Sequence, residues 1–299
     1  MKKTIKACIL AVCLVAAFLA VKNEYARHLP SGAYGMQPLI KNGEVDHLFI
    51  GSSMFRQGLD IGVLEEQLGD SVYILSYNGN QPMLMAMELE YLLEQGVEIG
   101  HLYVDLYGYT AAANPWISDT KILLDTDLRF KMEMWNLMKT HNETKFLDFY
   151  ELFVTSNNEQ ILTWPIHNRL LSAQFYKGGT LVHSAGTTEA ALAYSLGTRE
   201  GVHPAQAEGY ARIMEFASDH GIALTFIETP KYHAMYLDET YRMLLKECLK
   251  LVDGHTAVLF EGMEFDNTDP ARFQDLIHLS GEGRKEYTGL LCERLKAAE

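Results

Sequence analysis

The chain has 299 residues, a formal net charge of -14 and 48% hydrophobic residues. This length suits one α/β domain of about 200–250 residues with an insertion, and it allows a large core. No cluster of Lys or Arg lies beyond the extreme N-terminus, so the acidic balance argues against a polyanionic partner such as nucleic acid. The four cysteines are too few and scattered for a disulfide framework, and the histidines show no metal-binding spacing. We therefore expect no structural metal and no cofactor.

An apolar segment lies at the N-terminus. Three lysines precede an uninterrupted apolar run over Ala7–Val21. This pattern is typical of a signal peptide or an N-terminal membrane anchor, which we place at residues 1–22. The lysines favour a retained anchor with its N-terminus in the cytoplasm and the remaining chain outside it, whereas cleavage would give a secreted protein. Residues 23–43 are predicted to be a linker.

Strands and helices alternate after this linker. The apolar patterns predict strands at Val45–Ile50, Ser71–Ser76 and Gly100–Leu106, and helices at Leu59–Leu68 and Pro82–Gln95. Strand–helix–strand order is typical of right-handed crossovers on a parallel sheet. The first third of the body is therefore predicted to be one half of an α/β sheet.

The regular order is interrupted at about residues 109–203, a stretch that holds all three tryptophans, Trp116, Trp135 and Trp164. We interpret it as a largely helical insertion whose tryptophans pack in the core, with stacking on sugar rings or on a membrane surface as alternatives. The α/β order then resumes with helices at Pro204–His220, Leu237–Leu251 and Gly281–Ala298 and strands at Ile222–Glu228 and Thr256–Phe260. Residues 44–299 are thus predicted to form a three-layer α/β/α sandwich with a flavodoxin-like parallel sheet of about five strands.

Two short motifs offer the groups needed for nucleophilic catalysis. Gly51, Ser52 and Ser53 follow the first predicted strand, and Asp275 and His278 lie just before the last helix. Ligands of open parallel sheets bind beyond the carboxyl ends of the strands. A serine hydroxyl becomes an effective nucleophile when an imidazole takes its proton and a carboxylate orients the imidazole. Each motif alone would indicate a helix cap or surface side chains, but their joint placement favours catalysis.

With these motifs in this order, the chain from about Val45 to the C-terminus resembles the SGNH (GDSL-like) hydrolase superfamily. The resemblance implies that Ser53 is the nucleophile, His278 the general base and Asp275 its orienting acid. Ser52 stands where that family has an aspartate. The chain is most similar to the divergent, membrane-associated branch of the superfamily, which includes DltD-like proteins and exopolysaccharide O-acetyltransferases.

The resemblance also implies an oxyanion site. Gly79, in the turn after the second strand, corresponds to a family glycine whose N–H binds the oxyanion; the alternative is that Gly79 only serves the turn. After the third strand the family carries Gly-x-Asn-Asp, whereas this chain has residues 107–110, Tyr-Gly-Tyr-Thr. The expected asparagine is missing, and Tyr109 and Asn80 are the candidates to replace it.

Three more residues are candidates for contact with a substrate. Ser52 and Arg56 lie within one helical turn of Ser53, and His233 follows the fourth predicted strand on the same edge of the sheet. The alternatives are an arginine paired with a neighbouring acid and a histidine that only closes a loop.

The motifs and the resemblance together imply an exported serine esterase or O-acyltransferase. Its substrates would be acyl esters, most simply acetyl esters, of a cell-envelope or extracellular glycan. A transferase would work beside an integral membrane acyl donor protein. Two alternatives stay open: a catalytically inactive envelope protein that uses the fold for binding or assembly, and a flavodoxin-like nucleotide-binding protein. The second lacks a phosphate-cradling glycine loop after the first strand.

Overall fold

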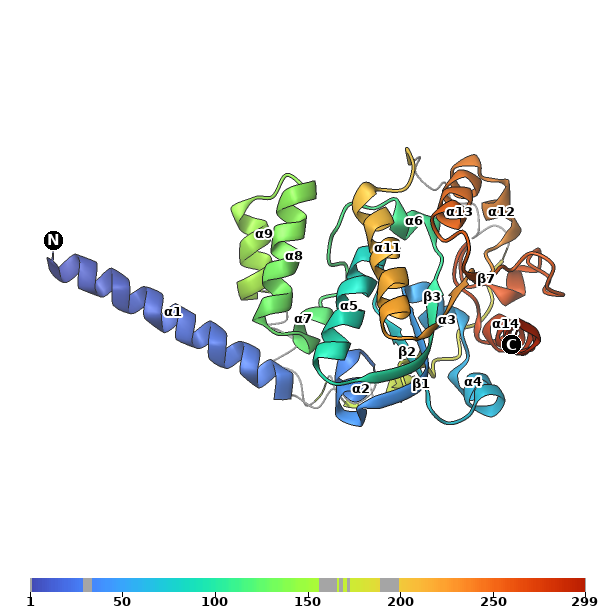
Figure 1. The fold of residues 1–299 in the computed structure, drawn as a ribbon, viewed down its shortest axis with the longest axis horizontal. Coiled ribbons are helices and arrows are strands. Elements are labelled where there is room, and N and C mark those ends of the chain that lie inside the picture. The colour runs from blue at the N-terminus through green and yellow to red at the C-terminus, as the bar shows by residue number, and fades with distance from the viewer. Residues whose placement is uncertain are drawn as a thin grey trace.

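A computed structural model of the chain describes residues 2–28, 34–155, 166, 169–170, 173–188 and 199–298. Its centre is a five-stranded parallel sheet with the order β2-β1-β3-β6-β7. Figure 1 shows helices packed around this sheet. The strands are β1 (Glu44–Gly51), β2 (Val72–Ser76), β3 (Glu98–Asp105), β6 (Ala223–Ile227) and β7 (Thr256–Val258). This order is that of flavodoxin-like sheets, as predicted.

Each face of the sheet has its own apolar core, because successive strand residues point to opposite faces. On β1, Leu48 and Ile50 belong to one cluster and Phe49 to the other. The first face is covered by α2 (Met36–Asn42), α5 (Pro82–Glu94) and α11 (Pro204–Asp219). The second is covered by α3 (Ser53–Gly58), α4 (Ile61–Leu68) and α14 (Gly281–Ala298). Side chains of α13 (Glu239–Leu251) enter both cores. The predicted three-layer α/β/α sandwich is confirmed.

The described part of the insertion between β3 and α11 is mainly helical. It contains α6 (Gly108–Ala111), α7 (Ile122–Asp125), α8 (Leu128–His141), α9 (Phe146–Tyr150), a π-helix (Glu151–Thr155) and the hairpin strands β4 (Phe175–Tyr176) and β5 (Gly179–Thr180). The hairpin covers the outer edge of β2, where the Ile74 amide donates to the Lys177 carbonyl oxygen at 3.0 Å. Trp135 packs against the first core and Trp116 is partly exposed. Trp164 lies outside the described residues.

The N-terminal region is more helical than the sequence pattern indicates. Helix α1 (Lys2–His28) continues beyond the apolar run, and α2 lies inside the predicted linker. Within α1, Thr4–Lys22 is long and apolar enough to cross a membrane. This segment is a weak sign of a signal sequence or an anchor, since both have the same composition.

The remaining differences concern short elements after β1, β6 and β7. Helix α3 was not predicted because its six residues are too short to show a helical apolar period. The last strand ends at Val258 rather than Phe260, because the chain turns there and the Met263 amide donates to the Phe260 carbonyl. The other short helices are α12 (His233–Leu237) and a 3₁₀ turn (Pro270–Arg272).

Candidate active site

The predicted nucleophile lies in a tight turn between β1 and α3. Ser52 is the N-cap of α3, and its hydroxyl accepts a hydrogen bond from the Met54 amide at 3.2 Å. Ser53 is the first residue of the helix and is partly exposed. A side chain at Gly51 would place its Cβ 2.6 Å from the Asp105 Cβ, so the turn requires glycine there. The strand end and the cap together place Ser53 at the carboxyl edge of the sheet.

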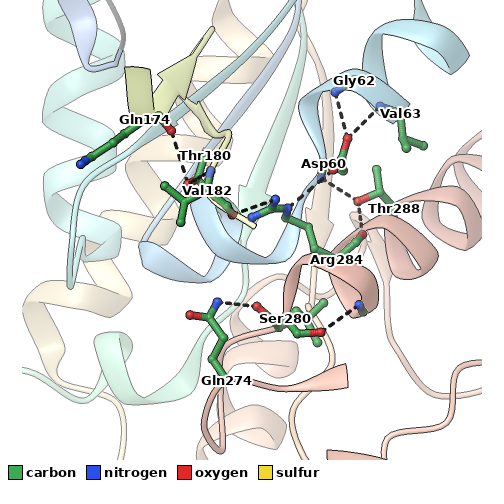
Figure 2. Close-up of polar contacts among 12 residues, drawn as sticks. Asp60, Gly62, Val63, Gln174, Thr180, Val182, Gln274, Ser280, Arg284 and Thr288 are labelled. Carbon is green, nitrogen blue, oxygen red and sulfur yellow. Dashed lines mark hydrogen bonds and ion pairs between the residues drawn. The ribbon is translucent and has the colours of Figure 1, made fainter. Parts of the chain in front are cut away.

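The predicted base lies in a compact loop before α14. A β-bridge joins Phe273 to Leu279, and the Gln274 amide donates to the His278 carbonyl at 2.8 Å. As Figure 2 shows, the Gln274 side chain reaches the same loop end and Ser280 caps α14. The Ser280 hydroxyl accepts from the Gly283 amide at 3.1 Å, as an N-cap does. These bonds fix the loop at both ends.

Inside the loop, the Asp275 carboxylate organises the backbone as well as the imidazole. Its Oδ1 accepts from the amides of Ile277 and His278 at 2.9 and 2.8 Å. Its Oδ2 lies 2.8 Å from His278 Nδ1. Because a carboxylate only accepts, Nδ1 must carry the proton, which leaves Nε2 of the neutral ring as an acceptor.

The structure brings the two distant motifs together. Ser53 Oγ lies 2.9 Å from His278 Nε2, although the two residues are 225 positions apart in the chain. Ser53, His278 and Asp275 therefore form a continuous hydrogen-bonded chain of hydroxyl, imidazole and carboxylate. This arrangement has the connectivity by which a serine is activated as a nucleophile.

The carboxylate end of this chain is open to solvent. The Asp275 side chain is 53% exposed. Burial raises the pKa of its carboxyl group, but the hydrogen bond and charge of His278 and the two backbone amides outweigh burial and lower the pKa below its usual value. Asp275 is therefore ionised over the neutral range and can stabilise a protonated His278.

A second carboxylate supports the serine turn from the buried side. Asp105, at the end of β3, accepts from the Ser52 amide at 3.1 Å and from the Ser52 hydroxyl at 2.6 Å. Burial raises the pKa of Asp105, against the charge of Lys231 and the hydrogen bonds from Ser52. Ser52 thus links the end of β3 to the first turn of α3.

The buried cation beneath the turn is Lys231. It is fully buried, its ammonium donates to the Thr229 hydroxyl at 2.8 Å, and it lies 5.2 Å from the centre of the Tyr107 ring. Burial lowers the pKa of Lys231, against the charges of Glu228 and Asp105. Neither Asp105 nor Lys231 was predicted as part of the site. The signal in the sequence was a charged residue at or just after the carboxyl end of an apolar strand. Asp105 ends β3, and Lys231 follows β6.

Gly79 lies in the turn after β2, at the same edge of the sheet. Its φ of +61° is a left-handed conformation that favours glycine. The amides of its neighbours Asn78 and Asn80 bond to Asp119 Oδ2 at 3.0 Å and to the Tyr77 carbonyl at 3.2 Å. Among the described residues, the Gly79 amide has no such partner, so it is available as a donor.

Asn80 is hydrogen-bonded to groups in the interior of the protein. Its side-chain nitrogen donates to Glu88 Oε2 at 3.1 Å and lies 3.4 Å from the Gly51 carbonyl oxygen. The residue is buried. The Asn80 side chain therefore supports the serine turn from the interior, and its role in binding the oxyanion stays a prediction.

Arg56 is paired with neighbouring groups of the protein. Its guanidinium donates to the Asn78 side-chain oxygen and lies 3.8 Å from Asp119 Oδ2. It also stacks near the rings of Tyr34 and Phe175. These contacts match the alternative in which Arg56 pairs with a nearby acid.

Tyr109 and His233 lie on neighbouring segments. The Tyr109 ring packs 6.4 Å from the Tyr241 ring, and burial with the nearby Asp238 carboxylate raises the pKa of Tyr109 to about 12. The Tyr109 ring also lies 6.0 Å from the Tyr107 ring, which follows the end of β3. The His233 segment borders the loop that carries His278, because the Tyr232 amide donates to the Leu276 carbonyl at 2.9 Å.

The arrangement defines an α/β sandwich with a serine–histidine–aspartate site at the carboxyl edge of its sheet. Within the described residues, no group of three or more His, Cys, Asp or Glu side chains is placed to hold a metal ion. A scan against protein-family models finds no match, and a search of curated proteins finds no significant similarity.

Proposed function

We propose that this protein is an extracytoplasmic serine esterase or O-acyltransferase, related to the membrane-associated SGNH hydrolases, that acts on acyl esters of a cell-envelope glycan. The observation that carries the proposal is the 2.9 Å contact between Ser53 Oγ and His278 Nε2. Packing alone does not require that two distant motifs meet with the serine hydroxyl facing the unprotonated nitrogen of the imidazole. A catalytic relay requires that they do.

The reaction follows from the hydrogen-bond directions. His278 Nε2 takes the Ser53 proton as Ser53 Oγ attacks the acyl carbonyl carbon, and a tetrahedral intermediate forms. The C–O bond to the alcohol breaks, the leaving alkoxide takes the proton from Nε2, and the acyl group remains on Ser53. Water or a sugar hydroxyl then gives its proton to Nε2 and attacks the acyl carbonyl carbon. The bond between this carbon and Ser53 Oγ breaks, and Oγ takes the proton back from Nε2. Asp275 stabilises the imidazolium in both halves.

Two backbone amides are suited to bind the oxyanion. The N-cap residue Ser52 already accepts from the amides of Met54 and Phe55, so the Ser53 amide remains as a donor at the start of α3. The available Gly79 amide lies at the adjacent strand end. Backbone donors of this kind are worth about 3–4 kcal/mol each in other enzymes.

The openness of the site favours a polymeric or surface-bound substrate. Asp275 is half exposed and Ser53 is partly exposed, so an acylated sugar on a large glycan can approach without entering a deep pocket. A chain of net charge -14 is better suited to neutral than to polyanionic glycans. The apolar α1 would hold the enzyme at the membrane, where an integral membrane acyl donor could supply a transferase.

The test combines covalent labelling with ester hydrolysis on the full chain in detergent. A fluorophosphonate should add its mass to Ser53 and stop hydrolysis of a chromogenic acetate ester. Ser53→Ala should abolish both signals. Ser52→Ala removes the cap but keeps the nucleophile, so it should reduce hydrolysis and retain labelling.

Two outcomes would contradict the proposal. If wild type hydrolysed the ester no faster than Ser53→Ala, the protein would be the noncatalytic binding or assembly module of the same fold. If only Ser52→Ala lost the label, Ser52 would be the nucleophile and the relay would be assigned to the wrong hydroxyl.

A further inference from the structure

Large apolar side chains are exposed together on α8 and α9. In α9, Phe146 is 76% exposed and Leu147 is 70% exposed, and both Phe149 and Tyr150 are also exposed. Leu128 and Met132 are exposed one turn apart on α8. We call these six residues the α8–α9 patch. Several large apolar side chains exposed on two successive helices favour a site of contact with a partner or a membrane.

The patch is held in place by packing from behind. The Phe149 ring lies 5.3 Å from the Trp135 ring and 4.6 Å from the Phe153 ring. Trp135 in turn packs against the core of the first sheet face. Phe149 therefore holds α9 against the body, and the other exposed side chains of α9 have an ordered support.

The candidate membrane-spanning helix α1 is connected to the body close to the N-terminal end of α8. Helix α1 ends at His28, and the body resumes at the buried residue Tyr34. Six residues span at most about 21 Å when fully extended, so the body cannot lie far from the end of α1. The candidate span ends at Lys22, so the last turns of α1 and this linker keep the body within about 30 Å of a bilayer that α1 crosses.

The contacts of α2 show which side of the body lies near the end of α1. The Met36 amide donates to Asp125 Oδ2 at 3.1 Å, and the Gln37 side chain donates to the Asp125 carbonyl at 2.8 Å. Asp125 ends α7, and α8 begins three residues later at Leu128. Figure 1 likewise shows α8 and α9 on the side of the body from which α1 projects.

We propose that the α8–α9 patch rests in the interfacial region of a phospholipid bilayer and holds the body against the membrane that α1 crosses. Tyr and Phe side chains on an exposed helix suit the boundary between headgroups and acyl chains. The net charge of -14 gives no attraction to anionic lipids, so apolar insertion would supply the binding. This inference does not depend on the chemistry of Ser53.

The test measures membrane depth at matched positions in the full chain. Leu147→Cys and Leu237→Cys, whose native side chains are 70% and 72% exposed, would each be labelled with an environment-sensitive fluorophore. The background replaces Cys8 and Cys13 with alanine and keeps the buried Cys248 and Cys292. The proteins are reconstituted in phosphatidylcholine vesicles with or without brominated acyl chains.

The label at position 147 should lose about half of its fluorescence to brominated lipid, because an inserted apolar face lies about 5–10 Å into the interface. The label at position 237, on α12, should not change. A Phe146→Ser/Phe149→Ser double variant should remove the quenching at position 147. A label on Cys13, retained in a separate protein, should be quenched as part of α1.

Each remaining outcome would overturn the proposal. Quenching at Cys13 without quenching at position 147 would show that α1 is inserted while the patch stays in water. No quenching at Cys13 would remove the bilayer on which the patch is proposed to rest. Protection of position 147 from an aqueous quencher in native membranes, but not in lipid vesicles, would assign the patch to a protein partner.

Discussion

The two serines of the turn face acids in opposite surroundings. Ser53 is linked through His278 to Asp275, whose side chain is 53% exposed and whose pKa is lowered by its hydrogen bonds despite partial burial. Ser52 bonds directly to Asp105, which is 1% exposed and whose pKa is raised by burial. The outer pair ends in solvent, and the inner pair ends in the core.

This difference indicates that the acids on the two sides of the serine turn have different roles. The outer acid stays charged at low cost and can compensate an imidazolium that forms and disappears in each cycle. The inner acid lies beside the buried charge of Lys231 and holds the turn in a single geometry. We therefore expect outer substitutions to change kcat and inner substitutions to change chiefly stability.

The largest effect is expected for His278→Ala. Removal of the base that contacts Ser53 should lower kcat for acetate ester hydrolysis by at least about a thousandfold, with unfolding in urea nearly unchanged. His220→Ala, at an exposed position on the end of α11, is the matched control and should keep full activity. A His278→Ala enzyme within tenfold of wild type would show that the outer pair is not a relay.

Asp105→Ala tests the inner side. It removes the partner of Ser52 and a counter-charge of Lys231, so the free energy of unfolding should fall by about 3 kcal/mol. The measurement is urea unfolding, with Asp46→Ala, an exposed aspartate on β1, as the control. The residual folded fraction should still react with a fluorophosphonate. Wild-type stability with complete loss of labelling would reverse the division between the two sides.

Much of the fold could be predicted from the sequence, because buried parallel strands are apolar and begin and end near turn residues. Leu48, Phe49 and Ile50 show this clearly: all three are buried, on alternating faces. Short elements such as α3 and the hairpin β4–β5 have too few residues to show a period. Their positions are determined by packing against α14 and the edge of β2.

For the site, the sequence predicts the outer side and misses the inner one. Ser53, His278 and Asp275 belong to short motifs whose spacing is visible in the chain. Asp105 and Lys231 are single residues separated by 126 positions, and only the register of β3 beside β6 brings them together. Burial, which defines their role, has no local sequence pattern.

Asp275→Asn probes the exposed end of the outer relay. The amide keeps a side-chain oxygen but loses the charge that stabilises a protonated His278, so kcat should fall by about a hundredfold to ten-thousandfold with KM unchanged. Because Asp275 is half exposed, the free energy of unfolding should change by less than about 0.5 kcal/mol. A loss of stability without a loss of kcat would make Asp275 a structural residue of the loop.

Substitution of Glu88 tests whether the buried groups that support the serine turn include the contact between Glu88 and Asn80. Its carboxylate holds Asn80, and burial raises the pKa of Glu88, with the charges of Asp125 and Asp119 acting in the same direction against the Asn80 hydrogen bond. The folded state therefore keeps its proton at pH values where the unfolded chain releases it. Stability is fully present below the ordinary carboxyl pKa of about 4.3 and is lost as pH rises toward the raised folded value.

Glu88→Gln mimics the protonated form at every pH. It should leave the free energy of unfolding unchanged near pH 4 and raise it by about 1–2 kcal/mol at pH 7, measured by urea unfolding at both values. Glu66→Gln, at an exposed position on α4, should show no such pH-dependent gain. Destabilisation by Glu88→Gln at pH 7 would mean that Glu88 is charged in the folded protein. The buried acids would then support the serine turn in their charged form. They would differ from the exposed Asp275 less than their burial indicates.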